Sequence, residues 1–419
     1  MRRVLVLLLA VLAAATACTS SGGGSADPPS IRIGAIYPLS GTQGPGGVEE
    51  FLGVQVAAQL VNRDGGVAGR PIVLDQMDVP EADAAPGAIL RLAGRGDRLV
   101  IGSYGSTISS PAAATATAHG SLFWETGAVG KLAGTGGGDL VFRVAPTGGM
   151  LGRNAIAFVA DQLAPRLHRR AGSLRFAVAA VDDVYGEAVA AGALDELRGR
   201  GLRAVADVRY DPRHLDAAKV VRRIAATRPD VLFVVAYLDD GVALRRQQVR
   251  QHLHLAASIG TSSSYCMPAF GALLGKEALG LFASDKPDTH GINPKGLRPD
   301  ARALLARADG AYRAAYGQSM SAAALAGFSG AWALFHWVLP RAASLDPAGV
   351  ARAARSVSVP AGSLPNGSGL AFGRPGGPDA GANLRAAGVI WEWTAVGRRQ
   401  VTWPPQFATA PIAAIPLAR

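Results

Sequence analysis

The sequence is poor in the residues that enzymes and metal centres use. Only two cysteines occur, Cys18 and Cys266, and the seven histidines lack the paired spacing of a metal site. The two nearest histidines, His252 and His254, would point to different sides of a helix. We therefore expect no metal, no cofactor and no disulfide, and we expect Cys266 to be a small buried residue.

Catalytic and nucleotide-binding motifs are also missing. Residues 44–49 approach the dinucleotide fingerprint, but Glu49 stands where its third glycine belongs. Residues 271–276 approach a phosphate-binding loop, but the loop is one residue short and no Ser or Thr follows Lys276. No Gly-x-Ser-x-Gly sequence occurs, so a nucleophile elbow is excluded. The sequence therefore predicts a protein that is not an enzyme.

Clustered charge and long apolar runs are scarce as well. The net charge is +11, but the basic residues are scattered arginines such as Arg222 and Arg245, which suit the polar faces of helices. A nucleic-acid partner is therefore not expected, because it would need a basic patch. The longest apolar stretch after the N-terminus, residues 322–339, contains Ser329 and His336 and is predicted to be a buried helix.

The N-terminus has the three regions of a secretory signal. Two arginines precede an apolar run over residues 4–15, and small residues lead to Cys18. This arrangement resembles a bacterial lipoprotein cleavage site, although Ala15 replaces the usual leucine. We expect residues 1–17 to be a signal peptide and residues 18–30 a lipidated cysteine with a flexible tether. The alternative is a plain cleaved signal with an incidental cysteine.

Beyond the tether, short apolar runs alternate with helical patterns in two successive series. This alternation indicates parallel sheets covered by helices on both faces, and two series indicate two doubly wound lobes. The predicted strands are residues 31–37, 71–74, 99–102, 122–124, 140–144, 176–181, 204–209, 231–236 and 388–403. The predicted helices are residues 49–62, a short one opening near 110, 151–163, 187–198, 216–227 and 241–253, with 301–355 mostly helical.

Four segments carry a resemblance to a known family, namely residues 33–41, 62–71, 100–102 and 183–187. They resemble the type I periplasmic binding fold and, more narrowly, the branched-chain amino-acid binding proteins of ABC transporters. The resemblance implies two lobes joined by a three-stranded hinge. It places residues 31–147 and 279–375 in lobe one and residues 148–278 and 376–410 in lobe two.

The resemblance also implies ligand contacts from both lobes. A serine and backbone amides would hold a carboxylate, and the matching residues are Ser106 and its neighbour Thr107; the alternative is that both only cap a helix. Tyr185 and Tyr237 match tyrosines that fold over the ligand, or they pack structurally. The full predicted set is Ser106, Thr107, Gly127, Val129, Tyr185, Tyr237 and Ser262, with Tyr104, Glu125 and Asp183 as further candidates.

Several positions depart from the family pattern. Val129 replaces a threonine, and Gly46 stands where a pocket-lining tyrosine is common. Ser262 stands near the place of the acid that binds the ligand's ammonium group, and Gly148 aligns with an aspartate that some members use. A buried ammonium without an acid would be costly. Two explanations stay open: the ligand has no ammonium group, or a substitute acid exists, the candidates being Glu125, Asp182 and Asp183. We expect weak or no binding of leucine, isoleucine and valine, and better binding of carboxylates or amides without an α-ammonium group, including aromatic ones because Trp124, Tyr104 and Tyr185 are nearby.

These features predict a lipid-anchored, monomeric solute-binding protein on the outer face of a bacterial cell membrane. Its lobes would close on a small polar ligand (an amino acid, amide or carboxylate) and deliver it to an ABC permease. The alternative is a sensor or co-receptor of the same fold, which would signal without transport.

Overall fold

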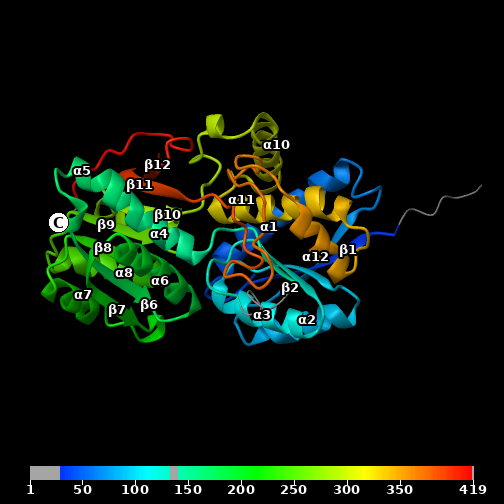
Figure 1. The fold of residues 1–419 in the computed structure, drawn as a ribbon, viewed down its shortest axis with the longest axis horizontal. Coiled ribbons are helices and arrows are strands. Elements are labelled where there is room, and N and C mark those ends of the chain that lie inside the picture. Colours follow the sequence, from blue (N-terminus) through cyan, green and yellow to red (C-terminus); the bar gives the residue numbers. More distant parts are fainter. Residues whose placement is uncertain (1–28, 133–139, 418–419) are drawn as a thin grey trace, which may run out of the picture.

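The computed structural model describes residues 29–132 and 140–417, which form two α/β lobes lying side by side (Figure 1). The predicted fold class is therefore confirmed. Cys18 and the predicted signal peptide lie outside the described residues.

Lobe one contains a five-stranded parallel sheet in the order β2-β1-β3-β4-β5. Its strands are β1 (Ile31–Tyr37), β2 (Ile72–Asp78), β3 (Leu99–Gly102), β4 (Leu122–Glu125) and β5 (Val141–Arg143). Its helices are α1 (Gly44–Arg63), α2 (Ala84–Gly94), α3 (Ser106–Ala118), α10 (Pro299–Tyr316), α11 (Ala322–Trp332) and α12 (Pro347–Ser356). Helices α2 and α3 pack together, and α1 packs against α11 and α10.

Lobe two contains a seven-stranded sheet in the order β12-β11-β10-β9-β8-β6-β7, in which β11 alone runs antiparallel to the other strands. Its strands are β6 (Arg175–Val181), β7 (Arg203–Tyr210), β8 (Val231–Val235), β9 (Ala257–Thr261), β10 (Phe282–Asp285), β11 (Val389–Ala395) and β12 (Arg398–Trp403). Its helices are α4 (Gly148–Phe158), α5 (Ala164–Arg166), α6 (Val184–Gly199), α7 (Ala217–Ala226), α8 (Leu238–Arg250) and α9 (Pro268–Leu274). Helix α4 packs against α6, while α8 packs against α7 and α9.

The chain passes between the two sheets after β5, after β10 and before β11. The second passage comes later than the boundary expected at residue 279, because β10 bonds to β9 and β11 inside the lobe-two sheet. The third also comes later than residue 376, because Ala382 and Asn383 form bridges with Arg143 and Phe372 of lobe one. In both cases, hydrogen bonding between backbone segments sets where the chain passes from one lobe to the other. These segments, β10 and residues 382–383, are short and have no strong apolar pattern in the sequence.

Two helices begin earlier than their sequence suggested. Helix α1 starts at Gly44 within the segment expected to be a loop, since the Gly47 N–H already donates to the Gln43 carbonyl and Pro45 suits the first turn. Helix α3 starts at Ser106, because the Ser109 N–H donates to the Gly105 carbonyl. The elements not anticipated from the sequence are α2, β9, α9 and β10.

One helical stretch of the described residues, Ala322–Arg341, is long and apolar enough to cross a membrane, but its most apolar window is 83% buried. It comprises α11, a π-helical continuation, Ala333–Val338, and a 3-10 turn, Leu339–Arg341. Gly53 of α1 lets it approach closely, since a Cβ there would lie 2.0 Å from the Ala324 carbonyl oxygen. The stretch is therefore a core helix of lobe one, as its polar interruptions predicted.

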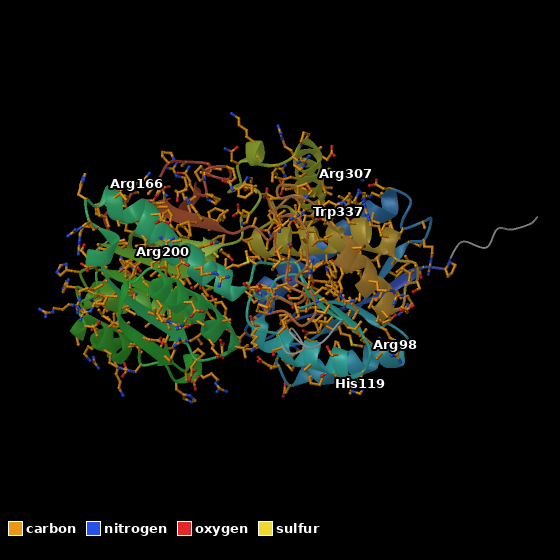
Figure 2. The ribbon with its side chains drawn as sticks, viewed as in Figure 1. Arg98, His119, Arg166, Arg200, Arg307 and Trp337 are labelled. Atoms are coloured by element: carbon orange, nitrogen blue, oxygen red, sulfur yellow. The ribbon has the colours of Figure 1, made fainter. Side chains whose placement is uncertain are left out.

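The arginines are dispersed over the molecule. Figure 2 shows Arg166 and Arg200 on lobe two, and Arg98 and Arg307 on lobe one. Some of them form exposed ion pairs, such as Arg200 with Asp161 at 2.7 Å. Such pairs contribute little stability each.

Candidate ligand-binding site

A cavity of about 330 Å³ lies between the two lobes, beside the carboxyl ends of strands from both sheets. This is where open α/β sheets commonly bind ligands. Lobe one contributes Gln43, Pro45, Gly46, Glu49, Tyr104, Gly105, Ser106, Gly127, Val129, Ser321, Ala322 and Ala323. Lobe two and the passage after β10 contribute Tyr185, Tyr237, Leu238, Ser262, Ser263, Cys266, Met267, Pro268, Ala269, Asp285, Lys286 and Arg399.

Most residues singled out from the sequence meet at this cavity. Those that line it are Ser106, Gly127, Val129, Tyr185, Tyr237, Ser262 and Tyr104. Thr107, Glu125 and Asp183 do not line it. Trp124, another aromatic residue of lobe one, is fully buried in that lobe and donates its indole N–H to the Gly330 carbonyl.

Ser106 occupies the first turn of α3 and is 5% exposed. Its Oγ accepts a hydrogen bond from the Gly130 N–H at 2.9 Å, so its own proton stays available to a ligand oxygen. The helix N-terminus adds backbone N–H groups and a favourable dipole for an anion. This end of the cavity can therefore hold a carboxylate or amide oxygen.

The Thr107 side chain links two helices of lobe one, α3 and α1. Its Oγ1 bonds to the Gln43 side-chain amide at 2.8 Å, which ties the start of α3 to the start of α1. The expectation that Thr107 lines the cavity is therefore corrected, because the helix turns its hydroxyl toward α1.

Glu125 also has a structural role within lobe one, because backbone groups of that lobe bond to its carboxylate. Its carboxylate accepts the backbone N–H groups of Ser103, Gly127 and Ala128 at 3.0, 2.8 and 2.7 Å. Burial raises the pKa of Glu125, while the Ser109 side chain and the backbone bonds from Ala128 and Gly127 lower it. Glu125 therefore orders the loops after β3 and β4 and does not face the cavity as a substitute acid.

Asp183 lies just behind the cavity wall of lobe two. Its carboxylate caps α6 by accepting the N–H groups of Tyr185 and Gly186, each at 2.9 Å, and it also accepts the Tyr237 hydroxyl at 2.6 Å. The neighbouring Asp182 is exposed and does not line the cavity. None of the three acids expected to replace the missing family acid faces the cavity.

Two aromatic side chains form the wall of lobe two. The rings of Tyr185 and Tyr237 lie 5.4 Å apart, and the Tyr185 hydroxyl bonds to Thr261 Oγ1 at 2.6 Å. Burial raises the pKa of both phenols, so both are neutral donors at physiological pH. Rings of this kind can cover an apolar or aromatic part of a ligand.

Packing explains two of the departures from the family pattern. At Gly46 a Cβ would lie 2.1 Å from Cζ of Tyr104, so the Tyr104 ring fills the space of a residue-46 side chain. Tyr104 adopts a φ of 87°, a left-handed conformation that is strained for a tyrosine. At Gly148 a Cβ would lie 2.9 Å from the Val189 side chain of α6. Close packing between α4 and α6 therefore leaves no room for an acid at residue 148.

Sequence reasoning missed four charged residues of the cavity: Glu49, Asp285, Lys286 and Arg399. Glu49 accepts the Ser321 hydroxyl at 2.6 Å, and Lys286 Nζ donates to the Gly127 carbonyl at 3.0 Å. The Arg399 guanidinium pairs with Asp288 at 2.9 Å and lies 3.8 Å above the Trp391 ring. Asp285 ends β10 and Lys286 follows it, so recognising that strand would have pointed to both.

A family model described as periplasmic binding protein matches residues 30–389. The Leu/Ile/Val-binding protein homolog 8 of Brucella abortus (strain 2308) is 26% identical over 383 residues, covering 91% of this chain and 92% of the relative. The homolog 7 of the same strain is 26% identical over 346 residues, covering 82% and 85%.

Solved structures share the fold. A leucine-binding protein LivK from Thermotoga maritima aligns with a TM-score of 0.74 at 18% identity, covering 88% of this chain and 97% of its own. The branched-chain amino-acid protein LivJ from Streptococcus pneumoniae, in complex with isoleucine, aligns at 0.70 with 17% identity, covering 90% and 100%. A solute-binding protein from R. palustris in complex with benzoate aligns at 0.71 with 16% identity, covering 92% and 99%.

Proposed function

Because the chain belongs to the periplasmic binding protein family, we propose that it captures a small polar molecule between its lobes and delivers it to an ABC permease. The observation that carries this proposal is the interlobe cavity, to which both lobes contribute side chains. A ligand that touches Ser106 on one lobe and Tyr185 on the other would stabilise the closed arrangement over an open one.

The chemistry of the cavity supports a ligand with a polar head and an apolar body. Ser106 at the start of α3 provides donors for a carboxylate or amide oxygen. Tyr185, Tyr237 and Val129 provide apolar surface, and the volume of about 330 Å³ suits a small molecule. The two solved relatives named with ligands carry isoleucine and benzoate, which fit this description. An amino acid, amide or carboxylate is therefore the proposed ligand class.

The N-terminal sequence supports a location outside the cytoplasm. The basic, apolar and small-residue regions suit export, and Cys18 suits a lipid anchor that holds a monomeric protein near its permease. Transport is favoured over sensing because two of the similar solved structures are named as transporter solute- or substrate-binding proteins.

The proposal is tested by purifying the protein under native conditions and identifying retained small molecules by mass spectrometry. Adding the identified molecule back to ligand-free protein should reduce the radius of gyration in solution scattering and raise the melting temperature. Ser106→Ala together with Tyr185→Ala should abolish both effects. Ligand binding with an unchanged scattering curve would contradict capture by lobe closure.

A further inference from the structure

One carboxylate in the cavity has an oxygen that the described part of the chain does not satisfy. Asp285 lines the cavity and is only 2% exposed. Its Oδ2 accepts the Cys266 thiol at 2.7 Å, but its Oδ1 has no hydrogen-bond partner among the described residues. A buried carboxylate oxygen without a donor is costly, so its retention in a binding cavity indicates a ligand donor.

The position of Asp285 follows from the register of two parallel strands. Ser284 of β10 stands opposite Thr261 of β9. The next residues, Asp285 and Ser262, therefore leave the sheet side by side at its carboxyl edge, and both line the cavity. Ser262 is the position where the family pattern suggested an acid. No acid stands at residue 262, but Asp285 provides one at the end of the neighbouring strand, β10.

Two cationic side chains lie around Asp285. Lys286 Nζ donates to the Gly127 carbonyl of lobe one, and Arg399 pairs with Asp288 through Nη2, while its Nη1 has no hydrogen-bond partner among the described residues. Burial raises the pKa of Asp285, and the charges of Lys286 and Arg399 act in the opposite direction, although neither side chain makes a hydrogen bond to it. The Cys266 thiol is a weak donor with a single proton; its sulfur lies 2.7 Å from both Asp285 Oδ2 and the Ser262 carbonyl oxygen, and it does not reach Oδ1. Oδ1 is thus the acceptor left for a ligand.

We propose that Asp285 Oδ1 binds a protonated amine of the ligand and so determines its specificity, replacing an acid at position 262. This inference rests on the proposed function and narrows its ligand class to small molecules that carry an ammonium group. The ammonium would lie at the passage between the lobes, because Asp285 ends β10 and Lys286 already bonds to lobe one.

The test uses four probes in titration calorimetry: L-leucine, L-phenylalanine and their deaminated counterparts, 4-methylpentanoate and 3-phenylpropanoate. The wild-type protein should bind at least one amino acid about tenfold to a hundredfold more tightly than its counterpart, as expected for a charge-assisted hydrogen bond. Asp285→Asn, which keeps the shape but loses the charge, should remove that preference.

Two further variants separate recognition from folding. Asp97→Asn alters another buried aspartate, which is 2% exposed and bonds to Arg32 away from the cavity, and it should keep the preference. Ser262→Asp added to Asp285→Asn returns the acid to the neighbouring strand and should restore part of the amino-acid affinity.

Three results would overturn the inference: equal or tighter binding of the deaminated probes by wild type, an unchanged preference in Asp285→Asn, or failure of all four probes to bind. The proposed function would survive each of them if native purification retains a small molecule that closes the lobes. It would fail on its own if no retained or added molecule closes them.

Discussion

The hydroxyl of Tyr237 donates to the carboxylate of Asp183 at 2.6 Å, and the same carboxylate accepts the backbone N–H of Tyr185. One acid therefore fixes both aromatic residues of the lobe-two wall, although it does not face the cavity itself. The family resemblance marked Asp183 as a candidate ligand contact, and the structure gives it a positioning role.

Replacing Asp183 with alanine should cost about 1 kcal/mol of unfolding free energy, the usual effect of losing a helix N-cap. It should also weaken ligand binding, because Tyr237 loses its hydrogen bond. Asp216→Ala is the matched control, since Asp216 caps α7 by accepting the Lys219 N–H at 2.8 Å and lies away from the cavity. Urea unfolding and binding of the retained ligand give the two readouts. Equal binding losses in both variants would contradict the positioning role.

Gly46 should be intolerant of any side chain. Gly46→Ala would place a Cβ 2.1 Å from Cζ of Tyr104 and should displace that ring, reducing ligand affinity. Gly44→Ala, in the same helical turn, meets its nearest neighbour at 3.7 Å and should be harmless. Adding Tyr104→Ala to Gly46→Ala should cost less than the two single effects combined, and calorimetry on the four proteins measures this coupling. Additive effects would show that the ring does not depend on Gly46.

Glu50 should make stability depend on pH. Burial raises its pKa from an ordinary 4.5 to about 8, so the folded state holds the proton more tightly than the unfolded state. The free energy of unfolding should therefore fall as pH rises from about 4.5 to about 8, by about 1.4 kcal/mol per unit of pKa difference.

Glu50→Gln removes this ionisation while its Oε1 can still accept from Thr126, as Glu50 does at 2.6 Å. The variant should gain stability relative to wild type at pH 9 and lose that advantage near pH 4.5. Urea unfolding at pH 5, 7 and 9 measures the difference. A difference between the two proteins that does not change with pH would exclude Glu50 as the source.

The proposed lipid attachment would depend on the sulfur of Cys18. Cys18→Ser should leave an uncleaved or soluble product, because a serine cannot form the thioether. Detergent-phase partitioning of bacterial extracts, with Cys266→Ser as the control, compares the two cysteines. Equal partitioning of wild type and Cys18→Ser would refute the anchor.

The sequence alone determined most of the architecture. The predicted strands at residues 31–37 and 99–102 coincide with β1 and β3, because continuous apolar runs of that length have one stable environment, the centre of a parallel sheet. Residues that follow predicted strands, such as Tyr104 and Tyr237, line the cavity, since in parallel sheets the carboxyl ends of the strands meet at one edge. The resemblance added Ser106 and Tyr185, both of which line it.

Only the tertiary structure decided which polar groups face the ligand. Sequence spacing could not show that the Glu125 carboxylate accepts hydrogen bonds from three backbone N–H groups and so does not face the ligand. It also could not show that the Tyr104 ring fills the space beside Gly46. It also could not bring Asp285 beside Ser262, because the two residues are distant in the chain and meet only through the register of β9 and β10. Apolar periodicity is a local property, which a sequence displays directly. The use of a hydrogen-bonding atom depends on neighbours that folding supplies from elsewhere in the chain.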